Sequence, residues 1–167
     1  RADALGVRVV RLRIGVVLGP GGGALARLAP LFRLGVGGRV TLAGEQWVAW
    51  IHLDDVVGLA LHAARRDDVA GPVNAVAPAP VRNRDLTRAL AATLHRPALL
   101  PVPSLALRLA FGDMATVLTA SQRVVPDVAA ATGYRFAHPT IDDALAAALR
   151  PGEEEAPWAS VVSSARS

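Results

Sequence analysis

The sequence places a histidine and two aspartates within four positions, in residues 50–56 (WIHLDDV). His52 with Asp54 or Asp55 has the composition of a general acid–base pair, or of two ligands of a metal ion. A metal site needs a further ligand nearby, and the remaining histidines stand apart in the sequence, at His62, His95 and His138. We therefore expect no metal, and expect His52 to end a strand and Asp54 to cap the helix that follows.

A glycine-rich segment, residues 19–24 (GPGGGA), has the Gly-x-Gly-x-x-Gly/Ala spacing of phosphate-binding loops between a strand and a helix. Two features argue against a dinucleotide site. Pro20 has no N–H to offer, and no acidic residue ends a second strand about 20 residues later, where a ribose would be bound. We predict a flexible connection into a helix; the alternative, that residues 7–34 form the nucleotide motif themselves, stays open.

Composition indicates a globular chain and excludes several partners. Of the 167 residues, 52% are hydrophobic and 19% charged, which is enough for one substantial core. The net charge of +4 comes from arginines that are dispersed rather than gathered in a stripe, so we expect no nucleic-acid partner. No apolar run approaches the length of a membrane helix and no leader opens the chain, so we expect a cytoplasmic protein that binds no membrane. The absence of cysteine excludes disulfides and thiolate chemistry.

Strand and helix patterns alternate in the first half of the chain. Residues 7–14 alternate apolar and basic side chains and predict a strand, and residues 24–34 predict a helix. Short strands are expected at residues 40–42 and 47–51. The helix after residue 55 should bury one face, formed by Val57, Leu61 and Ala64.

The second half adds a short buried strand at residues 73–76 and a helix whose N-cap should be Asn83. Further helices are expected at residues 104–111 and from Thr140, whose spacing to Asp143 resembles a capping box. Residues 133–136 predict a short strand. Residues 151–167, which are acidic and then rich in serine, predict a disordered tail.

Two of these segments resemble the later motifs of the extended short-chain dehydrogenase/reductase superfamily. Arg13 precedes Gly19-Pro20 in the form Arg-x-x-x-x-x-Gly-Pro, and an aromatic-Ile-His-x-x-Asp turn follows at residues 50–55. Six more segments narrow the resemblance to an epimerase-like, cell-division-inhibitor-like family that ends in a domain of unknown function. They are QWxxWIH from residue 46, GPVNA from 71, PVP from 101, GDM from 112, QRVVP from 122 and GYRF from 133 with Pro139-Thr140.

The resemblance implies an α/β fold, the C-terminal part of a doubly wound, Rossmann-like parallel sheet with a small α+β lobe on the substrate side. Residues 1–76 would form the last strand and helix units, residues 77–150 the lobe, and residues 151–167 the tail. The family's dinucleotide loop and its Tyr-x-x-x-Lys pair would lie outside this chain, which contains no lysine and whose only tyrosine is Tyr134. NAD or NADP would therefore be bound mainly by a preceding part, and we expect the chain to be a fragment with no catalytic residue of its own.

Three positions depart from the family patterns. Members that act on nucleotide sugars carry an asparagine and a phosphate-binding arginine where this chain has Val16 and Val48, so the resemblance implies a different substrate. Asp127 stands where the epimerase-like family usually has a basic residue.

The expected pocket wall has three parts. Ligands of open α/β sheets gather at the ends of the strands, which here predicts Gly15, Val16, Val17 and Leu18. A turn would add Gln46 and Trp47, and the C-terminal lobe would add Arg123, with Gln46 and Arg123 as polar anchors. The resemblance thus implies the substrate-pocket half of an NAD(P)-dependent epimerase or oxidoreductase acting on an unidentified small molecule. A non-catalytic binding or regulatory module and an inactive truncated fragment remain alternatives, and the oligomeric state is open.

Overall fold

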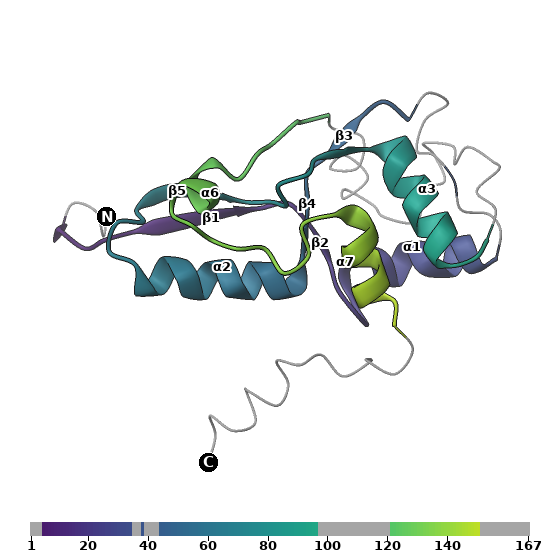
Figure 1. The fold of residues 1–167 in the computed structure, drawn as a ribbon, viewed down its shortest axis with the longest axis horizontal. Helices are drawn as coiled ribbons and strands as arrows, with labels where there is room; N and C mark the ends of the chain where they lie inside the picture. Colours follow the sequence, from purple (N-terminus) through teal and green to yellow (C-terminus); the bar gives the residue numbers. More distant parts are fainter. Residues whose placement is uncertain (1–4, 35–37, 39–43, 97–120, 151–167) are drawn as a thin grey trace, which may run out of the picture.

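The computed structural model describes residues 5–34, 38, 44–96 and 121–150 (Figure 1). The strand expected at residues 40–42, the helix expected at 104–111 and the tail at 151–167 fall outside these ranges. Within them, no helix is long and apolar enough to cross a membrane.

Two parallel strands form the first part of the sheet. β1 (Val10–Ile14) pairs with β5 (Gly71–Ala75) in a register that runs from Val10 opposite Gly71 to Ile14 opposite Ala75. Helix α2 (Leu53–Arg65) packs beside them, and the short helix α6 (Asp127–Ala131) packs on β5 (Figure 1). Apolar side chains from β5, α2, α6 and the neighbouring segments form one core cluster: Ile51, Leu59, Ala63, Val69, Val73, Ala75 and Ala129.

At Gly15 the sheet exchanges one strand partner for another. Gly15 N donates to Ala75 O (3.1 Å), whereas Val16 N donates to Ala49 O (2.7 Å), and β2 (Val16–Leu18) then runs parallel to β4 (Trp50–His52). The opposite edge of β4 accepts a bond from Ala77 N at Trp50 O (2.7 Å), so β4 inserts between β2 and the chain that leaves β5. A Cβ at position 15 would lie 2.7 Å from Ala49 O, which explains why glycine occupies this branch point.

A second core cluster lies beyond this branch, among α1 (Gly23–Arg33), α3 (Asn83–Thr93) and α7 (Ile141–Ala148). Leu18 and Trp50, each 1% exposed, connect the sheet to it. A small antiparallel pair, β3 (Trp47–Val48) with β6 (Val81–Arg82), completes the lobe. The last helix begins as predicted, because the Thr140 hydroxyl accepts the Asp143 N–H.

Four local predictions are wrong. Val57 and Leu61 are 44% and 49% exposed, and α2 instead buries Asp55, Leu59 and Ala63. The apolar pattern pointed to the wrong face because the buried face of this helix carries an acidic residue. Asn83 is the first residue of α3 and not its N-cap, a shift of one position.

The other two wrong predictions concern the start of α2 and the segment at residues 133–136. Asp54 does not cap the helix: the His52 Nδ1 atom accepts the Asp54 N–H (3.2 Å), and the helix begins at Leu53. Residues 133–136 form no strand: the backbone N–H groups of Gly133 and Tyr134 donate to Ala130 O and Ala129 O of α6, and the Tyr134 hydroxyl donates to Asp55 on α2.

Candidate functional site

Trp47 is the centre of a basic cluster that joins three distant parts of the chain. In the β3–β6 pair, Trp47 lies opposite Arg82, whose guanidinium carbon is 3.9 Å from the centre of the indole ring. The guanidinium carbon of Arg123 lies 5.4 Å from the same ring. Trp47 N also donates to Ser121 Oγ (3.1 Å), which fixes the start of the segment that carries Arg123. The structure thus brings together Trp47 and Arg123, two residues that the sequence placed in one pocket wall.

The location of this cluster follows from the strand order. β3 leads directly into β4, whose first residue pairs with Val16 just after β1 ends. The cluster therefore lies near the carboxyl ends of β1 and β5, the edge at which open α/β sheets collect ligands (Figure 1). Gln46 is adjacent, and its backbone oxygen accepts the Asn83 N–H (2.8 Å), which holds β3 against the start of α3.

The strand-end residues occupy more buried positions. Leu18 is a core side chain, Val16 packs against the same cluster, and Val17 packs against the other one. At Gly15 the backbone lies so close to Ala49 that a Cβ atom would not fit. Arg13 is exposed on β1. Their part in a pocket wall stays a prediction.

The glycine-rich loop has packing reasons for its composition. A Cβ on Gly19 would lie 2.9 Å from the Leu53 side chain. Gly21 and Gly23 have φ values of +65° and +62°, a region that side chains other than glycine rarely adopt. Pro20 lies between Gly19 and Gly21, two residues after the end of β2. Close packing and a tight turn therefore account for these glycines without a phosphate.

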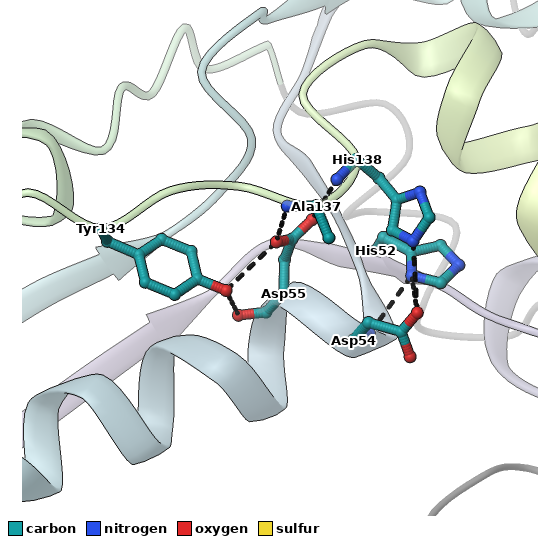
Figure 2. A network of polar contacts seen from close by, with 6 residues as sticks. All are labelled: His52, Asp54, Asp55, Tyr134, Ala137 and His138. Carbon is teal, nitrogen blue, oxygen red and sulfur yellow. Dashed lines mark hydrogen bonds and ion pairs between the residues drawn. The ribbon is translucent and has the colours of Figure 1, made fainter.

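His52, Asp54 and His138 come together, although His138 is far away in the sequence (Figure 2). His138 Nε2 lies 3.2 Å and His52 Nδ1 3.4 Å from Asp54 Oδ2, and the two imidazole rings are 4.0 Å apart. The three groups are close enough to hold a metal ion. However, His52 Nδ1 already accepts the Asp54 N–H, so coordination through that atom would remove the cap of α2. The absence of a metal remains an expectation. His138 supplies the third potential ligand atom, which the spacing in the sequence did not reveal.

Asp55 is the most deeply buried acidic side chain of the described residues, with 0% exposure. Its Oδ1 atom accepts from Ala137 N (2.8 Å) and from the Tyr134 hydroxyl (3.1 Å), and Oδ2 accepts from His138 N (3.0 Å). Figure 2 shows these bonds converging on one carboxylate. Asp55 therefore joins the first turn of α2 to the segment before α7, a role that its position in the sequence did not indicate.

This contact also determines what Tyr134 can do. Burial raises the pKa of Tyr134 well above its usual value, and the neighbouring charge of Asp55 raises it further. The tyrosine therefore stays protonated and donates to Asp55. Because a catalytic tyrosine of the Tyr-x-x-x-Lys type needs a lowered pKa, Tyr134 is suited to a structural role.

Gly58, on α2, provides the space for the Tyr134 hydroxyl, which a Cβ at that position would overlap. In an ordinary helix Gly→Ala gains about 1 kcal/mol, but here the overlap should reverse the sign and cost about 1–3 kcal/mol. Chemical denaturation of Gly58→Ala would measure the change. In a Tyr134→Phe background, which lacks the hydroxyl, the cost should fall toward zero; an equal cost in both backgrounds would contradict this explanation.

Comparisons with known proteins connect this geometry to a family. Residues 102–148 match the family described as "Domain of unknown function (DUF1731)". An epimerase family protein of Mycobacterium bovis is 43% identical over 153 residues, which cover 90% of this chain and 50% of the relative. Epimerase family protein SDR39U1 of Mus musculus is 44% identical over 139 residues, which cover 83% of this chain and 47% of the relative. The chain thus spans about half the length of these relatives, and it matches their C-terminal part.

A solved structure gives the same result. Human epimerase family protein SDR39U1 (isoform 2), solved with NADPH, superimposes with a TM-score of 0.79 at 38% identity, covering 85% of this chain and 48% of that one. The expected fold class is confirmed: the chain has the α/β fold of the C-terminal part of Rossmann-fold epimerases.

Proposed function

We propose that this chain, which is the C-terminal portion of an epimerase family protein with the short-chain dehydrogenase/reductase fold, forms the substrate-pocket half of an NAD(P)-dependent epimerase or oxidoreductase. The observation that carries the proposal is the meeting of Trp47 and Arg123 near the carboxyl ends of β1 and β5. An aromatic surface and a cation at this edge are suited to binding and orienting a small polar molecule.

The residues of this chain do not fit the nicotinamide cofactor itself. Packing at Gly19 and the positive φ values of Gly21 and Gly23 account for these loop glycines, Tyr134 is held protonated, and the sequence has no lysine. When bound elsewhere in the whole protein, the cofactor would supply the hydride chemistry. The part of this chain would be to bind the substrate, orient it and exclude water from it.

The isolated chain should not bind a dinucleotide tightly. Calorimetric titration with NAD(H) and NADP(H) should show no micromolar affinity. Pro20 has no backbone N–H to donate to a phosphate, and the glycines of this loop are required for its packing and turn. Micromolar binding that is abolished by bulky substitutions at Gly19 and Gly21 would overturn this prediction. It would establish residues 7–34 as the nucleotide motif.

A non-catalytic binding module is the second candidate. It is supported by the state of Tyr134, which is held protonated by its hydrogen bond to the buried Asp55. Ligand binding without turnover in a whole protein that carries the family's Tyr-x-x-x-Lys pair would favour it over the enzyme.

A further inference from the structure

Some arginines of the described residues have their charges balanced by a carboxylate, and the two arginines at Trp47 are not among them. Arg66 pairs with Asp68, Arg84 with Glu45, and Arg88 with Asp85. Among the described residues, neither Arg82 nor Arg123 forms an ion pair with a carboxylate. Arg82 Nη1 donates to the backbone oxygen of Glu45, and the guanidinium of Arg123 lies over the indole ring.

Two cations therefore share one aromatic ring without an acidic partner in this part of the chain. The indole face attracts each guanidinium by about 0.5–2 kcal/mol, but the two positive charges repel each other. An oxyanion that contacts one or both guanidinium groups would offset their positive charge and accept bidentate hydrogen bonds from these planar groups.

We propose that Arg82 and Arg123, held at Trp47, bind the oxyanion of the substrate, a carboxylate or a phosphate group. This inference rests on the proposed function and adds a substrate class to it. Arg123 is exposed, and Trp47 and Arg82 are half-buried, so a ligand has access to all three. The Trp47 ring would support the adjacent part of the ligand.

The neighbouring residues explain why Arg82 can take this role. Val48 is 5% exposed and points into the core, so position 48 offers no charge to a ligand. Its cross-strand partner is Val81, and the next pair along is Trp47 with Arg82. Adjacent residues of a strand point to opposite faces, so Arg82 lies beside Trp47 on the face away from Val48, and it supplies a positive charge there at a residue that the sequence alone did not single out.

The test is to titrate the full 167-residue chain with inorganic phosphate and, separately, with succinate. The Trp47 indole N–H signal would be followed by NMR and assigned with Trp47→Phe. We expect saturable shifts, and about tenfold weaker binding in Arg123→Gln and in Arg82→Gln, because each removes a charge-assisted contact. Arg88→Gln removes an equal charge from an exposed position that pairs with Asp85, and should bind like the parent chain.

Stronger binding of phosphate would identify a phosphorylated substrate, and stronger binding of succinate a carboxylate; either result supports the site. Equal affinities in Arg123→Gln and the parent chain, or an equal loss in Arg88→Gln, would overturn it. If Arg82→Gln fails to fold, the anion affinity of Arg123→Gln, which changes an exposed residue, is the deciding measurement. Anion binding at these arginines without any contribution to turnover in the whole protein would leave the site standing and refute the pocket function.

Discussion

Replacing Asp55 by alanine should destabilise the chain by about 3–5 kcal/mol, the largest loss expected from any single substitution discussed here. The substitution leaves three donors without their acceptor: the backbone N–H groups of Ala137 and His138, and the Tyr134 hydroxyl. Each unsatisfied donor in a buried environment costs about 1–3 kcal/mol. The loss should appear in urea denaturation as a lower midpoint with little change in slope.

Asp54 is a matched control for this experiment. It is the adjacent acidic residue in the same helical turn, but its side chain is 51% exposed and it pairs with His138 at the surface. Asp54→Ala should therefore cost less than about 1 kcal/mol. Asp55→Asn keeps one acceptor oxygen and turns an amide donor toward a backbone N–H, so its cost should lie between the two. An Asp55→Ala variant no less stable than Asp54→Ala would contradict the role assigned to this carboxylate.

The two aspartates show which features of the fold could be predicted from the sequence and which could not. Regular local patterns were sufficient for β1, α1, α3 and α7, because the periodicity there agrees with the packing, and at α7 the capping residue Thr140 does so as well. The buried face of α2 was misread because it is centred on a carboxylate whose donors come from residues 134–138. Nothing in the sequence near Asp55 reveals partners that lie about 80 positions away.

The candidate site was predictable to a similar extent. Trp47 and Arg123 were identified by their type and by the family resemblance, and the fold brings them to one ring. Arg82 was missed because its role depends on the antiparallel register of β3 and β6, which places it opposite Trp47. His138 was missed for the same physical reason, since only the fold places its ring against His52.

The second large effect concerns turnover. A general acid or base contributes about 10²–10⁴-fold to a reaction rate, and this chain has neither a lysine nor a tyrosine free to lose its proton. The purified chain should therefore show no oxidoreductase activity with any carbonyl substrate. Activity should require a preceding segment that carries the Gly-x-x-Gly-x-x-Gly loop and the Tyr-x-x-x-Lys pair.

The most direct measurement is nicotinamide absorbance, recorded for the chain alone and for the chain fused to such a segment, with a panel of small carbonyl compounds. A fusion whose segment carries phenylalanine in place of the catalytic tyrosine serves as the control for contaminating reductases. We predict turnover by the intact fusion only, and none by the chain alone or by the phenylalanine control. Turnover by the purified chain alone, above the rate of that control, would contradict its assignment as the substrate-pocket half.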